Sequence, residues 1–198
     1  MRIIFGILLG LLVCMSCGKD TKRSRDIANT EVQLNLIRFD SLFAEATPAS
    51  LPALKSAFPM FFPPQYPDSV WVNRLQDSLQ QVMQEEVLKT FPNTSELKAD
   101  LEQLYKHIKY YDATFQLPKV YTLLNDVDYN NRILVADSLV CIGLDCYLGS
   151  KHPFYQGLPS YVSTQLHAKQ IVPDMAKALA KKKVVFPTSR IFLAQLVY

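Results

Sequence analysis

The segment 133–149 most constrains what this chain can fold into. Two short apolar runs, 133–136 and 139–142, flank the polar pair Asp137-Ser138, and Gly143 follows the second run. Short apolar runs separated by turn residues are typical of buried strands joined in a hairpin. The sequence therefore predicts a strand pair in the core that ends at Gly143 and leads into a surface loop.

That loop carries our candidate site residues. They are Asp145, Tyr147, His152 and Tyr155, and Asp174 at the start of a later predicted helix joins them. An Asp and a His could act as a base and its orienting group. However, the chain has no G-x-S-x-G elbow, phosphate loop, dinucleotide fingerprint or H-E-x-x-H motif. We therefore predict no catalytic residue, and expect these side chains to satisfy buried backbone groups at the bends.

The first 16 residues are typical of a lipoprotein signal peptide. Arg2 precedes an apolar run of about 11 residues, well short of the roughly 20 that a spanning helix needs. Ser16-Cys17 then resembles a bacterial lipobox, although Cys14 stands at the usual Leu position. We expect Cys17 to be acylated, with palmitate among its chains, because two or more acyl chains anchor a protein stably. The alternative is an ordinary secretory signal with a nearby cleavage site.

Composition and charge limit the rest of the chain. Residues 17–30 are polar and predict a flexible tether, and residues 31–198 are long enough for a single domain. The formal net charge is +3, too small to argue for a nucleic-acid partner.

No cofactor motif appears. Cys14 belongs to the signal and Cys17 to the lipid anchor, so Cys141 and Cys146 remain, and these two with three scattered histidines make no zinc site. A disulfide between the two cysteines and two free buried thiols both remain open.

The predicted architecture is α+β, with a small antiparallel sheet covered by helices. Alternation and β-forming residues predict strands, and helical periodicity with capping residues predicts helices, two of which form an antiparallel hairpin. Asp77 is expected to break and restart the first helix of that hairpin, and Asp40 to cap a short helix. The strands are expected at 32–36, 119–124, 132–136 and 139–142, and the helices at 41–46, after Pro52, at 68–90, 93–111, 159–166, 173–183 and 187–198.

An aromatic and proline-rich run, 58–64, cannot be regular structure for long. It is either a packed loop or an exposed docking patch. We favour the packed loop, because four exposed apolar side chains would be costly to leave in water.

Several motifs together resemble the gliding-motility lipoprotein B (GldB-type) family of the Bacteroidetes. They are Arg38-Phe39-Asp40, the run 142–149, His152-Pro153-Phe154-Tyr155, Leu158-Pro159, Tyr161 and 171–174, in addition to the lipobox. The resemblance implies a cell-envelope lipoprotein that gliding requires, anchored in a membrane by its lipid and facing the periplasm or the cell surface. Its implied partners are envelope or gliding-machinery proteins, and the family has no established catalytic residue to carry over.

Family members are longer than this chain, so we expect the domain to be incomplete at its C-terminus. The family also looks distantly like predicted zinc peptidases, in which the helix corresponding to 191–198 carries H-E-x-x-H. Here that segment has no histidine and no glutamate, so it offers no zinc ligand pair. We therefore predict a non-catalytic accessory of gliding or of a related envelope assembly. The alternatives are a metallopeptidase-like hydrolase whose active residues lie beyond residue 198, and an envelope binding module.

Overall fold

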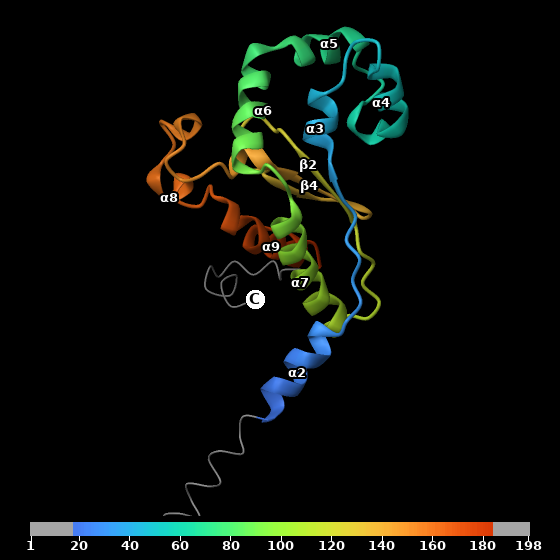
Figure 1. The fold of residues 1–198 in the computed structure, drawn as a ribbon, viewed down its shortest axis with the longest axis vertical. Coiled ribbons are helices and arrows are strands. Elements are labelled where there is room, and N and C mark those ends of the chain that lie inside the picture. The colour runs from blue at the N-terminus through green and yellow to red at the C-terminus, as the bar shows by residue number, and fades with distance from the viewer. Residues whose placement is uncertain (1–17, 184–198) are drawn as a thin grey trace, which may run out of the picture.

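The computed structural model describes residues 18–183, and Figure 1 shows their arrangement. This part of the chain contains eight α-helices and one four-stranded sheet, which confirms the α+β class. The strands are β1 (Leu36–Arg38), β2 (Lys119–Leu123), β3 (Ile133–Val135) and β4 (Leu139–Gly143). The helices are α2 (Gly18–Ala28), α3 (Phe39–Ala44), α4 (Leu51–Ala57), α5 (Asp68–Gln76), α6 (Ser78–Thr90), α7 (Ser95–Tyr111), α8 (Ser160–Ser163) and α9 (Ile171–Lys183).

The sheet is mixed and mostly parallel, so the predicted antiparallel sheet is wrong. Its strand order is β1-β2-β4-β3, and both the β1–β2 and the β2–β4 pairs are parallel. Parallel neighbours need a long crossover connection. The chain supplies one between β1 and β2, where α3 to α7 lie in sequence. Only β3 and β4 are antiparallel, and they form the predicted hairpin.

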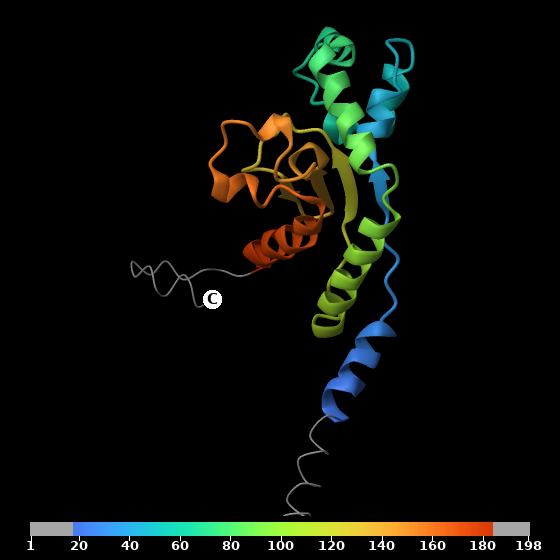
Figure 2. The ribbon, with the colours of Figure 1, turned by 60° about the vertical axis from the view of Figure 1, so that its left-hand side comes forward.

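Helices cover both faces of this sheet (Figures 1 and 2). On one face, Val120, Val140 and Ile142 belong to a core cluster that also contains residues of α7 and α9. On the other, Tyr121 and Cys141 pack in a second cluster with residues of α3, α4 and the 58–62 loop. Successive strand residues alternate between the two clusters because side chains along a strand point to opposite faces. Both faces are therefore buried.

The predicted break at Asp77 is confirmed, but the predicted helical hairpin is wrong. Asp77 caps α6 by accepting hydrogen bonds from the backbone N–H groups of Leu79 and Gln80, at 2.7 and 3.2 Å. After α6, α7 runs onward in the same general direction rather than folding back (Figure 1). The inner face of α7 packs into the core beside α9, while Leu79 and Val82 of α6 stay 60% and 45% exposed. Burial against the sheet and α9 thus takes the place of pairing between the two helices.

Four other elements differ from their predictions. Asp40 is not a helix cap, because α3 starts at Phe39, two residues before the predicted start, and Asp40 is buried in its first turn. The predicted helix 159–166 shrinks to α8, and the strand predicted at 32–36 shifts to β1. Residues 18–28, expected to be a flexible tether, form α2, which contacts α7.

The 58–64 run is packed, as favoured. Phe62 is 5% exposed, and the Phe61 ring lies 4.3 Å from that of Phe39 and 5.1 Å from that of Tyr121, between ring centroids. None of the described helices combines the length and apolar character that a membrane crossing requires. The signal segment, Cys17 and the predicted helix 187–198 lie outside the described residues.

Candidate functional site

Three parallel strands end at the same edge of the sheet, and each is followed by a polar residue two positions later. Asp40 follows β1, Asn125 follows β2 and Asp145 follows β4. In open sheets of parallel strands, ligands bind outside the carboxyl ends of the strands. This edge is therefore the candidate site, and of the predicted site residues Asp145 lies directly on it.

Asp145 holds the connection between β2 and β3. Its side chain is buried, and its two carboxylate oxygens accept hydrogen bonds from the backbone N–H groups of Asn125 at 3.0 Å and Val127 at 2.7 Å. These two donors lie in the β2–β3 connection, about 20 residues before Asp145 in the chain. Burial raises the pKa of Asp145, and the two N–H donors oppose that rise.

The backbone that Asp145 binds is strained. Asp126 and Val127 both have φ of 58°, a conformation that is a genuine outlier for a β-branched residue such as valine. Such residues persist only where surrounding contacts hold them, and they cluster at ligand clamps and switch regions. The Asp126 carboxylate meets Arg74 at 2.8 Å and Gln80 at 2.5 Å, so α5 and α6 also contact this turn.

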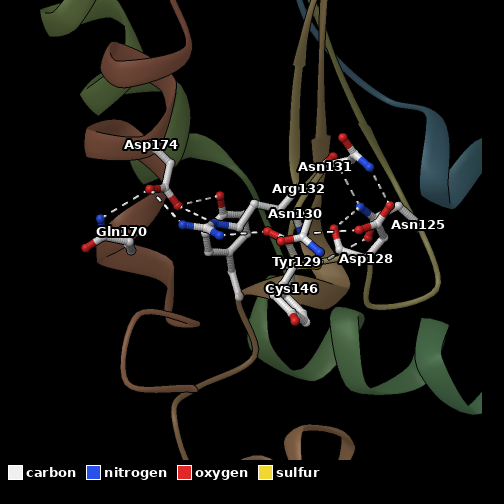
Figure 3. Close-up of polar contacts among 10 residues, drawn as sticks. Asn125, Asp128, Tyr129, Asn130, Asn131, Arg132, Cys146, Gln170 and Asp174 are labelled. Atoms are coloured by element: carbon white, nitrogen blue, oxygen red, sulfur yellow. Dashed lines mark hydrogen bonds and ion pairs between the residues drawn. The ribbon is translucent and has the colours of Figure 1, made fainter. Parts of the chain in front are cut away.

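Asn125 links the turn to β4 and to the loop after it. Its side-chain N–H₂ donates to the carbonyl oxygens of Asp128 and Asn131, and its Oδ1 lies 3.3 Å from Cys146 Sγ (Figure 3). A Cβ added at Gly143 would lie 2.6 Å from Asn125 Cγ. Glycine is therefore required at position 143 so that the Asn125 side chain can lie against β4.

Asp174 forms a second buried cluster, which connects α9 to the sheet (Figure 3). Its carboxylate accepts two hydrogen bonds from Arg132, at 2.5 and 3.0 Å, and one from the Tyr147 hydroxyl at 3.0 Å. Burial by itself raises the pKa of Asp174, but Arg132 and Gln170 together hold it below the usual value. Burial and the nearby Asp174 charge raise the pKa of Tyr147. Tyr147 and Asp174 are thus brought together as a structural link.

Tyr155 and His152 have separate partners. The Tyr155 hydroxyl donates to the Asp145 carbonyl at 2.7 Å and accepts from the Leu148 N–H at 2.9 Å, which ties the loop to itself. His152 Nε2 lies 3.3 Å from a carboxylate oxygen of Glu86 on α6. His152 therefore pairs with Glu86 rather than serving as the partner of the Asp145 carboxylate.

Sequence reasoning missed the role of Asp40. Its carboxylate accepts hydrogen bonds from Arg38 Nε at 2.9 and 3.1 Å and Nη2 at 2.6 Å, and from the Thr122 hydroxyl at 2.5 Å. Arg38 Nη1 also donates to the Phe91 carbonyl at 2.9 Å. Burial by itself raises the pKa of Asp40, but these donors and the Arg38 charge lower it. An Arg two residues before an Asp at a strand end was the available signal.

Cys141 and Cys146 are both buried free thiols, so no disulfide joins them. Burial raises the pKa of Cys141 to about 11. Across residues 18–183, no group of three His, Cys, Asp or Glu side chains is placed to hold a metal ion.

The comparisons with known proteins identify the family. A family model described as gliding motility protein GldB matches residues 20–198. No significant match was found among curated proteins or among solved structures. The matched range includes β1 to β4, the 125–132 turn and both buried carboxylate clusters. The chain therefore belongs to the GldB family of gliding motility lipoproteins.

Proposed function

We propose that this protein is a non-catalytic, lipid-anchored accessory of the gliding machinery or of a related envelope assembly. The observation that carries the proposal is the family match across residues 20–198. The Ser16-Cys17 pair at the end of a short apolar run supplies the acylation site. The acylated domain faces the periplasm or the cell surface, and its partners are envelope or gliding proteins.

The geometry of the buried carboxylates supports a structural rather than a catalytic role. Asp40 and Asp174 each form an ion pair with an arginine, at 2.6 and 2.5 Å, and Asp145 binds two backbone N–H groups. A general base must reach the proton that it abstracts. Here the carboxylate oxygens are committed to contacts that hold β1, α9 and the 125–127 turn in place.

The test compares two cysteine variants in a gliding host that carries this gene. Deletion should stop colony spreading, and the wild-type gene should restore it. Cys17→Ala should remove the lipid-modified N-terminal cysteine from the mass spectrum of the membrane fraction and should fail to restore spreading. Cys14→Ala is the matched control, because Cys14 lies within the signal peptide and is cleaved off with it. A Cys17→Ala protein that stays in the membrane and supports spreading would refute the lipid anchor.

The hydrolase alternative has its own measurement. Metal analysis of the purified gene product, including any residues that its reading frame encodes beyond residue 198, followed by melting with and without a chelator, should give no stoichiometric zinc and no shift in melting temperature. One tightly held zinc per chain with a chelator-sensitive melt would favour the metallopeptidase-like reading.

A further inference from the structure

Helix α2 directly follows the proposed lipidation site. Gly18 is its first residue, so an acylated Cys17 would hold this end of α2 at the headgroups of the membrane. α2 lies at the opposite end of the molecule from α4 and α5 (Figures 1 and 2). The anchor therefore leads into an ordered helix, and the orientation of α2 on the membrane sets the orientation of the domain.

α2 is fixed to the rest of the domain at its C-terminal end. It contacts α7, and its residue Ile27 is only 5% exposed. Lys106 Nζ of α7 donates to the carbonyl oxygen of Ala28 at 3.0 Å, and Lys109 Nζ donates to that of Glu31 at 3.5 Å. Because apolar burial and these hydrogen bonds hold α2 against α7, the domain has to follow α2.

The face of α2 opposite the buried Ile27 carries two exposed cations. Gly18, Lys22, Arg25 and Asn29 recur at the spacing of one helical stripe, and Ile27 lies on the other side of the helix. Asn29 extends this stripe by one turn, because its N–H donates to the Arg25 carbonyl at 3.0 Å. Lys22 and Arg25 are exposed, and neither side chain pairs with a carboxylate among residues 18–183.

The charge at this end of the molecule is positive. Residues 18–31 carry four basic and three acidic side chains. Asp26 lies at the border of the stripe and offsets part of its charge, but Lys106 and Lys109 add two cations whose hydrogen bonds go to carbonyl oxygens. Near an anionic bilayer, each Lys or Arg favours the bound state about fivefold. A zwitterionic bilayer offers no such attraction.

We propose that α2 lies along the surface of an anionic phospholipid bilayer, with Lys22 and Arg25 toward the headgroups and Ile27 toward the domain. The proposal rests on the lipid anchor of the proposed function. The acyl chains hold the protein in the membrane, and the cations of α2 give the anchored domain one orientation on it.

The native cysteines allow a single label to report on α2. Cys141 and Cys146 are buried, and an acylated Cys17 has no free thiol, so a thiol-reactive fluorophore labels an introduced cysteine. In Asn29→Cys the label lies on the stripe, about 16 Å along the helix from Gly18. It reaches the headgroups when α2 lies flat and stands away from them when α2 is upright.

The full-length acylated protein with this label would be reconstituted in phosphatidylcholine vesicles, with and without phosphatidylglycerol. All vesicles contain lipids that carry a nitroxide quencher on the headgroup. We expect strong quenching with phosphatidylglycerol and little without it. The quenching should be lost in about 1 M salt, where the screening length is only about 3 Å. The same label on Ser56→Cys, at an exposed position of α4, should be quenched much less.

Two matched double variants locate the charges. Lys22→Gln with Arg25→Gln should lower the ratio of flat to upright α2 about 25-fold, since each cation contributes about fivefold. Lys151→Gln with Lys169→Gln removes the same charge from exposed positions outside α2 and should leave the quenching unchanged. Circular dichroism checks that both variants are folded.

Three results would overturn the proposal. They are equal quenching of the Asn29 label in the two lipid compositions, equal quenching at position 56, and an α2 variant that behaves like its control. Vesicle flotation and mass spectrometry of Cys17 in the same samples report on the anchor separately. A protein that is acylated and floats but fails these tests keeps the anchor and refutes the orientation, whereas one that is neither acylated nor floating refutes both.

Discussion

Arg38→Met should be among the most destabilising single substitutions in this domain. The Asp40 side chain is fully buried, and Arg38 supplies three of its hydrogen-bond contacts, at 2.6 to 3.1 Å. The methionine keeps most of the apolar stem of the arginine but removes the guanidinium. Asp40 is then left with the Thr122 hydroxyl and the long contact to Gln84.

Two independent arguments set the size of the effect. Removing one partner of a buried ion pair typically costs about 3–5 kcal/mol, because the remaining charge stays uncompensated. Asp40 can avoid that state by taking up a proton, which at pH 7 costs about 4 kcal/mol for a carboxyl of ordinary pKa. The variant should therefore lose about 3–4 kcal/mol of unfolding free energy. In the variant, the pKa of Asp40 is raised above its unfolded value, so the loss should shrink as the pH falls from 7 toward 4.

Urea denaturation followed by circular dichroism at pH 7 and pH 4.5 measures both expectations. Arg74→Met is the matched control, since its partner Asp126 is 56% exposed and such pairs contribute about 0–1 kcal/mol. If Arg38→Met loses no more stability than Arg74→Met, or if its loss does not depend on pH, then Asp40 is not the buried, compensated charge described above.

Three further substitutions test the rest of the site by the same denaturation assay. Asp145→Ala should lower the unfolding free energy by about 2–4 kcal/mol, because two backbone donors lose their acceptor; wild-type stability would contradict this. Gly143→Ala should lower the unfolding free energy of the wild-type protein, but should lower that of the Asn125→Ala variant much less, because that variant lacks the clashing amide. Equal losses from Gly143→Ala in the two backgrounds would refute the close approach. The lowered pKa of Asp174 contributes stability that is lost as the pH falls below about 4. Asp174→Asn should therefore make the unfolding free energy depend less on pH in that acidic range. An unchanged pH dependence would argue against the ion pair with Arg132.

Local patterns were enough to predict several elements correctly. The 133–143 hairpin followed from two short apolar runs around Asp137-Ser138, and the structure forms it as β3 and β4. The break at Asp77 followed from its capping chemistry. These features depend on residues within a few positions of one another, so hydrophobic period and capping chemistry suffice to locate them.

Strand direction and partners were beyond the reach of such patterns. A strand has the same alternation whether its neighbour is parallel or antiparallel, and β1 pairs with β2 across a gap of about 80 residues. The expected antiparallel sheet failed for that reason, and the expected helical hairpin failed because α7 buries its inner face in the core with α9 rather than against α6.

The chemistry of the sheet edge was likewise decided by tertiary structure. The sequence by itself determined which residues carry carboxylates, aromatic rings and a lipidation motif. Only the parallel order of β1, β2 and β4 brings Asp40, Asn125 and Asp145 to one edge, because the carboxyl ends of parallel strands coincide there. The pairing of Arg132 with Asp174, 42 residues apart, and the contacts of Asp126 with Arg74 and Gln80 exist only when α5, α6 and α9 have packed. Contacts between distant segments are set by the burial of whole faces, which no local window of sequence records.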